Sequence, residues 1–365
     1  MKRMVGYLVV WLVVMGLLLA LVITYRTVGR GLTEPLLATG DPAVQVTILP
    51  GMDARRIAEL ADASGAHLDP TLFYWVARLR GQARAIKAGE YEISPKDTLL
   101  SLLDRLVSGD VVRYRVTVPE GDTAQDFLNR LATDPHLKHT LTGLSHAEII
   151  AALSLPIKHL EGQLFPDTYV FTGGTTDRQI VMKAYQSMQA HLDAAWANRA
   201  PDLPLKTPED ALILASIVEK ETGLADERGK VAGVFINRLN RGMRLQTDPA
   251  VIYGVAKSRR GVVDAATAPR SLTQSELRQD TPYNTYVRVG LPPTPIALPS
   301  EASLQAVTHP TQTDALYFVA NGSGGHTFSR TLQGHNQAVQ AWRKLENRRA
   351  DQVGDSKAAT SGGVK

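Results

Sequence analysis

Cysteine is missing from this sequence of 365 residues. The chain therefore has no disulfide bond, no thiolate metal ligand and no cysteine nucleophile. The chain also has no large excess of either sign of charge. Its 40 Lys and Arg residues and 36 Asp and Glu residues leave a formal net charge of only +4. No run of basic residues alternates with aromatic residues, so we expect no nucleic-acid partner. An anionic polymer or a membrane surface remains compatible with this charge.

Motifs for phosphate binding and for serine chemistry are absent as well. The sequence has no Walker loop and no G-x-G-x-x-G pattern, and Ser216 does not stand in a nucleophile elbow. His309, His326 and His335 lack the close helical spacing of an H-E-x-x-H zinc site. We therefore expect neither a bound metal ion nor a cofactor.

One long apolar run stands near the N-terminus. Residues 4–23 carry no charge, and a run of roughly 20 apolar residues matches the thickness of a bilayer. This run is too long for the apolar part of a cleaved signal peptide, and no small-x-small site follows it. Lys2 and Arg3 favour a cytoplasmic N-terminus, although Arg26 weakens the asymmetry. We predict an inner-membrane anchor over 1–26 that crosses the membrane once and leaves the rest of the chain in the periplasm.

The rest of the chain predicts an α+β protein with two folded parts. Residues 27–44 mix Gly, Pro and Thr without a period and predict a linker. Residues 45–113 predict a small α+β module, and residues 114–347 predict a mainly helical domain with short strands. The polar segment 348–365 predicts a disordered tail.

A strand–turn–helix pattern occurs twice. The first copy has a strand at 44–49 and a turn at Gly51, and the second has a strand at 114–118 and a turn at Gly121. Superposing the two glycines aligns the apolar positions that follow, so we infer an internal repeat. Further helices are expected at 70–79, 99–107, 145–153, 177–199, 208–224, 227–241, 300–307 and 334–347, with strands at 89–93 and 315–320.

The helix predicted at 208–224 carries the strongest candidate for a catalytic group. Glu221 continues the apolar stripe of Leu214 and Val218, because these residues are three or four positions apart. Glu219 points about 160° away at roughly 100° per residue. A carboxyl among apolar side chains has a raised pKa and can donate a proton near neutrality. Alternatively, Glu221 only marks where the helix leaves the core.

Three other segments are candidates for substrate binding, and the first of them combines turn residues, aromatic rings and acids in a way that suits a sugar cleft. The first, 160–169, has as its alternative a buried loop in which Asp167 acts as a turn acceptor. The other two, 244–249 and 281–286, predict polar loops around proline, and such loops are often functional.

Several blocks of the sequence together resemble the YceG-like (MltG) family of endolytic murein transglycosylases. These blocks are E-G at 161–162, F-P-D-T-Y at 165–169, I-V-E-K-E-T at 217–222, F-I-N-R-L at 235–239, G-M-R-L-Q-T-D-P at 242–249, Y-N-T-Y at 283–286, G-L-P-P at 290–293 and G-H-T-F at 325–328. The resemblance covers nearly everything from residue 45 to residue 345.

The resemblance implies a lyase that cuts the β-1,4 bond between N-acetylmuramic acid and N-acetylglucosamine, leaves 1,6-anhydromuramoyl ends and so terminates strand elongation. It implies a LysM-like module over 45–113, a lysozyme-like catalytic domain over 114–347, and Glu221 as the essential acid. The implied substrate-binding residues are Glu161, Phe165, Asp167, Tyr169, Gln246, Thr247, Asp248, Tyr283, Asn284, Tyr286 and His326. Gln163 and Thr294 depart from the family pattern, as does the segment 298–300.

Two other functions remain open at this point. The first is a non-enzymatic scaffold that binds peptidoglycan and recruits other proteins. The second is a lysozyme-type hydrolase, in which Glu161 or Asp167 would supply a second carboxylate. The partners expected in every case are glycan strands and the membrane, and peptidoglycan synthases are further candidates.

Overall fold

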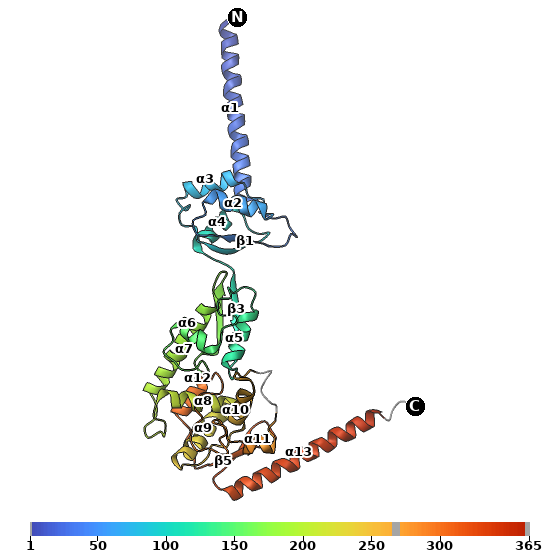
Figure 1. The fold of residues 1–365 in the computed structure, drawn as a ribbon. Helices are drawn as coiled ribbons and strands as arrows, with labels where there is room; N and C mark the ends of the chain where they lie inside the picture. The colour runs from blue at the N-terminus through green and yellow to red at the C-terminus, as the bar shows by residue number, and fades with distance from the viewer. Residues whose placement is uncertain (1, 265–270, 362–365) are drawn as a thin grey trace. The chain divides into compact units, whose positions relative to one another are not determined.

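The computed structural model describes residues 2–264 and 271–361 (Figure 1). The chain forms two compact units, of which the first comprises Met1–Arg115 and Val170–Gly174 and the second Val116–Tyr169 and Thr175–Lys365. The mixed α+β class expected from the sequence is present. The boundary after Arg115 lies close to the predicted one at 113. The return of Val170–Gly174 to the first unit was not predicted, and there Phe171 packs against Tyr114 with 5.8 Å between ring centroids.

The first unit surrounds a small two-stranded sheet. Its elements are α1 (Lys2–Thr33), β1 (Val44–Ile48), α2 (Ala54–Ala63), α3 (Pro70–Leu79), β2 (Gly89–Ile93) and α4 (Leu99–Ser108). β1 and β2 are antiparallel, with Val46 opposite Tyr91. Alternation places Val46 and Tyr91 on the buried face of the pair. There they pack with the apolar faces of α2, α3 and α4, including Phe73.

Helix α1 extends further than the sequence predicted. It continues to Thr33 instead of ending near residue 26, and its segment Trp11–Thr33 is long and apolar enough to cross a membrane. The linker predicted at 27–44 is therefore only partly a linker. Leu36 and Leu37 are buried in the core of the first unit. No proline precedes Pro35 to interrupt the helix, and burying the two leucines stabilises the segment that follows it.

The second unit is mainly helical. Its helices are α5 (Ala124–Thr133), α6 (His146–Leu153), α7 (Asp177–Ala197), α8 (Pro208–Glu221), α9 (Ala225–Asn240), α10 (Asp248–Arg260), α11 (Gln274–Arg278), α12 (Glu301–Thr308) and α13 (Leu332–Ser361). An antiparallel hairpin is formed by β5 (Tyr317–Ala320) and β6 (His326–Ser329). Strand β3 (Arg113–Thr117) pairs with β4 (Thr168–Thr172), and the boundary between the units passes through both strands.

The predicted internal repeat is present in the local structure. Gly51 follows β1 with a φ of 87°, and Gly121 follows β3 with a φ of 76°. Both values lie in the left-handed region that glycine tolerates best. Asp53 then caps α2 and Thr123 caps α5, each accepting a backbone N–H in the first turn.

Two segments of the second unit differ from the sequence prediction. Residues 244–249 were expected to form a loop, but helix α10 begins inside this segment at Asp248, with Pro249 in its first turn, where proline is favoured. The tail predicted to be disordered from residue 348 is helical to Ser361. The segment 332–361 contains no proline and is rich in Ala, Gln and Arg, which favour a helix. The last predicted tail residues, 362–365, lie outside the described residues.

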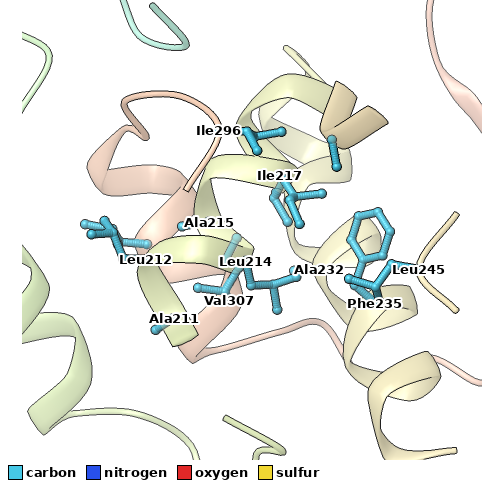
Figure 2. Close-up of a cluster of buried hydrophobic side chains, with 14 of the residues drawn as sticks. Ala211, Leu212, Leu214, Ala215, Ile217, Ala232, Phe235, Leu245, Ile296 and Val307 are labelled. Atoms are coloured by element: carbon cyan, nitrogen blue, oxygen red, sulfur yellow. The ribbon is translucent and has the colours of Figure 1, made fainter. Parts of the chain in front are cut away.

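Helix α8 lies at the centre of the second unit. Helices α7, α9, α10 and α12 all contact it. Figure 2 shows its side chains Leu212, Leu214 and Ile217 pointing outward from the helix in different directions. They meet Phe235 of α9 and Val307 of α12 in one cluster. A helix that is apolar all round is stable only when it is covered on all sides, and α8 satisfies this condition.

Helix α9 lies very close to the segment that leads into β5. A Cβ atom built on Gly233 would come within 2.5 Å of the Thr311 carbonyl oxygen, and one on Gly229 would come equally close to the Thr311 hydroxyl. One turn further, the Asn237 side-chain amide donates to the Thr313 and Ala315 carbonyls at 2.8 and 3.1 Å. Glycine at these positions therefore lets α9 dock on residues 311–315.

We predict that Gly233→Ala destabilises the protein, although glycine to alanine in a helix interior normally stabilises by up to about 1 kcal/mol. The new methyl group meets a backbone oxygen that cannot rotate away, and such overpacking costs about 1–3 kcal/mol. Gly229→Ala is the matched control, because a side-chain hydroxyl faces it. The free energy of unfolding in urea should fall for Gly233→Ala and change little for Gly229→Ala. Equal effects would contradict this explanation.

Candidate active site

Helix α8 presents Glu221 at its C-terminal end. The helix begins with a capping box in which Thr207 and Asp210 bond each other's backbone N–H groups, and Pro208 occupies its first turn. Every residue from 211 to 218 is buried. The helix ends at Glu221 because Thr222 is extended. The rigid, fully covered helix therefore fixes the position of this carboxyl group.

Glu221 lines a pocket of about 420 Å³. The other lining residues are Arg238, Leu245, Gln246, Asp248, Tyr286, Tyr317, Phe318, Leu332, His335 and Asn336. Six further elements or segments thus contribute to the pocket: α9, the segment before α10, the start of α10, the segment around Tyr286, strand β5, and the start of α13. The pocket combines aromatic rings with hydrogen-bonding groups, as sugar-binding sites require.

Burial raises the pKa of Glu221 to about 7. The Thr247 hydroxyl interacts with the carboxyl group and lowers the pKa, whereas the charge of Asp248 raises it. Electrostatic interactions with His326 and Arg238 lower the pKa of Glu221. Burial outweighs the attractive contacts, so the carboxyl group exists in both protonation states near neutral pH. This is the condition that a group needs in order to give and take a proton in one reaction.

The backbone before α10 is strained where it enters the pocket. Gln246 has a φ of 52°, a left-handed conformation that is uncommon for a residue with a side chain. Its N–H donates to the Thr285 carbonyl at 3.1 Å, and the next N–H, of Thr247, donates to the Thr285 hydroxyl at 3.0 Å. Strain of this kind persists only where surrounding contacts enforce it, and it is concentrated at functional sites.

Arg238 is the clearest pocket residue that the sequence analysis did not select. It is buried, and its guanidinium donates to the carbonyls of Leu316 at 2.7 Å and Leu245 at 2.6 Å. It thereby joins the start of β5 to the segment before α10, and it lies 5.2 Å from the centroid of the Tyr317 ring. An arginine inside the apolar row of α9 was the available signal, since arginine is rarely buried without partners.

Tyr286 and Asp248 form a pair in the pocket. The Tyr286 hydroxyl donates to Asp248 Oδ1 at 2.6 Å. Burial raises the pKa of Tyr286, and the bond to Asp248 raises it further. The hydroxyl therefore stays protonated and donates to Asp248, and its oxygen can still accept a hydrogen bond.

His326 lies close enough to Glu221 to influence its pKa, but its own contact is with Glu227. Its Nδ1 lies 2.7 Å from Glu227 Oε2, and its backbone N–H donates to Oε1 at 2.9 Å. Burial opposes ionisation of Glu227, yet the hydrogen bonds from His326 keep its pKa below the ordinary value. The contacts with Glu227 therefore hold the His326 ring in a fixed position near the site.

Glu219 lies outside the pocket, in the direction that helical spacing predicted. Its Oε2 accepts the Ser300 N–H at 2.9 Å, the Ser300 hydroxyl at 2.5 Å and the Ser303 hydroxyl at 2.7 Å. Ser300 caps α12, so the Glu219 carboxylate lies at the N-terminus of that helix, where negative charge is favoured. Its role is to hold α12 against α8.

The predicted residues of the segment 160–169 lie outside the Glu221 pocket. Glu161 is buried, accepts the Ala124 N–H at 2.9 Å and the Tyr253 hydroxyl at 3.0 Å, and lines a separate pocket. Phe165 stacks on His191 with 4.1 Å between ring centroids. Tyr169 is buried and donates to the Phe165 carbonyl. Asp167 is exposed, and its Oδ1 accepts the Thr168 N–H.

Tyr283 and Asn284 also lie outside the lining of this pocket. Asn284 is fully buried, and its side-chain amide donates to the carbonyls of residues 276, 277 and 279. Tyr283 is bonded to Lys257 at 2.9 Å and to Thr294 at 2.8 Å. These two residues shape the segment that carries Tyr286. Burial of both could not be foreseen from a polar loop pattern.

The departures from the family pattern have structural partners. Gln163 is buried and its amide donates to Glu209 at 3.0 Å and accepts from Gln189 at 3.0 Å. Thr294 bonds Tyr283, and Ser300 caps α12. None of these three residues lines the Glu221 pocket. Within residues 2–264 and 271–361, no three His, Asp or Glu side chains are grouped closely enough to hold a metal ion.

We predict that two substitutions move the pKa of Glu221 in opposite directions. Thr247→Val removes a hydroxyl that lowers this pKa, so the pKa rises. Asp248→Asn removes a charge that raises it and keeps an acceptor for Tyr286, so the pKa falls. Carboxyl ¹³C NMR titration measures both, with the Glu221 signal assigned by its loss in Glu221→Gln. Glu161, whose pKa burial also raises to about 7, is the internal control and should not move. Shifts of the same sign would contradict this assignment.

The sequence profile of the YceG-like family matches residues 46–341. The chain is 29% identical over 336 residues to a Bacillus subtilis (strain 168) protein named endolytic murein transglycosylase, and the match covers 87% of this chain and 90% of that protein. It is 28% identical over 338 residues to the Streptococcus pneumoniae serotype 2 (strain D39 / NCTC 7466) protein of the same name, covering 84% of this chain and 59% of that protein. A crystal structure of a YceG-like protein from Listeria monocytogenes superposes with a TM-score of 0.50 at 29% identity, over 82% of this chain and 99% of that one. A profile match that extends over most of the sequence shows that this chain belongs to the YceG-like family.

Proposed function

We propose that this chain is an endolytic peptidoglycan lytic transglycosylase and that Glu221 is its catalytic acid and base. The observation that carries the proposal is the Glu221 carboxyl group, which lines a polar and aromatic pocket and whose pKa burial raises to about 7. The names of the Bacillus and Streptococcus relatives support this reaction class. The proposed substrate is the β-1,4 bond between N-acetylmuramic acid and N-acetylglucosamine.

The reaction needs one carboxyl group. Protonated Glu221 gives its proton to the glycosidic oxygen as the bond to C1 of muramic acid breaks, and N-acetylglucosamine leaves with a free 4-hydroxyl group. The C6 hydroxyl of the same muramic ring attacks C1 and closes the 1,6-anhydro bridge. Glu221 takes the proton of that hydroxyl and is restored. The attacking group belongs to the substrate, so positioning the ring contributes much of the rate.

The pocket suggests which other residues act on the sugar. Gln246, Asp248 and Tyr286 are the proposed substrate contacts, because all three line the pocket with Glu221. Thr247 and His326 act through the pKa of Glu221. Arg238 is a positioning residue, because carbonyl groups on two segments of the pocket wall accept its hydrogen bonds.

The rest of the chain fits an enzyme held near nascent glycan. Helix α1 is proposed to be an inner-membrane anchor with a cytoplasmic N-terminus, with both units in the periplasm. The order β1–α2–α3–β2, with the two strands paired antiparallel, supports a LysM-like glycan-binding module. The second unit is proposed to be lysozyme-like. Synthases in the same membrane are proposed partners.

Hydrolysis is a second candidate reaction, and one observation favours it. Asp248 is a second carboxyl group in the same pocket as Glu221, and a second carboxylate is what a hydrolase uses to activate water or to act as nucleophile. Glu161 and Asp167, the second carboxylates considered from the sequence, do not line this pocket. The bond from Tyr286 occupies one oxygen of Asp248, which favours a structural or sugar-binding role for it.

We predict that Glu221→Gln lowers the rate of glycan cleavage by about 10²–10⁴-fold, the usual contribution of general acid–base catalysis. Glu219→Gln is the matched control on the same helix. It should retain most of the activity, because its contacts are with α12 and not with the pocket. Release of soluble muropeptides from purified sacculi measures the rate, and thermal unfolding confirms that both variants fold. Normal activity of a folded Glu221→Gln variant would refute the assignment.

We predict that the digestion products end in 1,6-anhydromuramic acid and contain no oxygen from solvent. Mass spectrometry of a digest made in H₂¹⁸O should find muramic ends lighter than reducing ends by one water. Reducing ends that carry ¹⁸O would instead establish hydrolysis with Asp248 as the second carboxylate. Binding to sacculi without any new ends would establish a scaffold.

A further inference from the structure

Helix α3 of the first unit has an apolar stripe that the core does not cover completely. Leu72, Trp75, Val76 and Leu79 are spaced i, i+3, i+4 and i+7, so they share one face of the helix. The opposite side of α3, with Phe73 and Ala77, is buried in the core. Trp75 is 51% exposed and Leu79 is 83% exposed. Two large apolar side chains therefore project side by side from a short helix.

The first residue of the stripe, Leu72, packs against the apolar helix α1. A Cβ atom on Gly31 would come within 2.6 Å of the Leu72 side chain, so α3 packs against α1 at this glycine. Gly31 lies near the end of the segment Trp11–Thr33 that could cross a membrane. Figure 1 shows α3 at the base of α1. The exposed part of the stripe thus lies at the level where that segment would leave the bilayer.

Three basic residues lie close in sequence to the exposed end of the stripe. Arg78, Arg80 and Arg84 are all exposed. Arg78 donates to the Tyr74 hydroxyl at 3.2 Å, and Arg80 pairs with Asp104 at 3.1 Å. Tryptophan and leucine next to arginine are typical of helices that lie in a membrane interface, where the ring and the leucine enter the headgroup region and the guanidinium groups meet lipid phosphates.

We propose that α3 is a membrane-interface helix, in which Trp75 and Leu79 insert into the outer surface of the bilayer that α1 crosses. The occupant of the apolar stripe is lipid, because the stripe is continuous with the membrane-spanning helix through Leu72 and Gly31. This second attachment fixes the orientation of the first unit on the membrane, which a single helix would leave free to rotate. The inference rests on the proposed membrane anchor and does not depend on the proposed reaction.

The absence of cysteine makes a direct test available, because a single introduced thiol is the only one in the chain. Leu79→Cys, Leu49→Cys and Leu18→Cys in the full chain are labelled with an environment-sensitive fluorophore. Each protein is reconstituted in vesicles of phosphatidylcholine and phosphatidylglycerol with brominated acyl chains. Leu49 is the matched control, an exposed leucine of the first unit between β1 and α2. Leu18 lies within the apolar segment of α1 and reports the anchor.

The proposal expects bromolipid to quench the label at position 79 at least about twofold more than the label at position 49, with a blue-shifted emission, as for a helix in the interface. Equal quenching at 79 and 49, with strong quenching at 18, would overturn it and leave the anchor intact. Weak quenching at all three positions would overturn the anchor as well. A blue shift at 79 without bromolipid quenching would assign the stripe to a second protein copy, and one that appears only with added glycan fragments would assign it to sugar. Activity of the three labelled proteins on sacculi tests the catalytic proposal independently.

Discussion

The burial of residues 211–218 of helix α8 is the constraint on which the rest of the second unit depends. Four helices contact α8, and Glu221 continues its buried stripe at the last residue of the helix. Thr247, His326 and Arg238 partly offset the desolvation, and the result is a pKa of about 7. The chemistry proposed here is thus a consequence of core packing.

The second carboxyl group of the same helix shows how position separates two similar residues. Glu219 and Glu221 are two positions apart, so the helix directs them to different surroundings. Glu219 accepts three hydrogen bonds from hydroxyl and N–H donors at the start of α12, and these bonds hold its carboxyl group against that helix. For Glu221, burial outweighs the favourable interactions with Thr247, His326 and Arg238, so its pKa is raised. The segment 219–221 therefore supplies both a residue that holds two helices together, Glu219, and a candidate acid, Glu221.

Much of this arrangement could be predicted from the sequence, because it depends on local patterns. The periodicity of residues 211–221 gave the helix and the direction of Glu221, and the two turn glycines gave the repeat. The rest depends on contacts between distant segments, which a single sequence does not contain. Asn284 and Glu161 look like surface polar residues in sequence but are buried with backbone partners, and Arg238 looks like an ordinary helix residue but lines the pocket. Helix α10 was missed because Asp-Pro reads as a turn signal as well as a helix start.

The anchoring of α8 has a consequence for how a glycan strand is accommodated. Glu219 fastens this helix to α12, and Lys220 Nζ fastens it to the Gly121 carbonyl at 2.9 Å, so the residues on both sides of the final turn are tethered. These contacts hold Glu221 in place relative to a bound sugar. We expect adjustment to a bound sugar to come from Leu332 and Asn336, which are exposed at the start of α13. The tethered end of α8 therefore keeps Glu221 in one position relative to the bond that is cut. Differences between glycan strands have to be accommodated by the other side of the pocket.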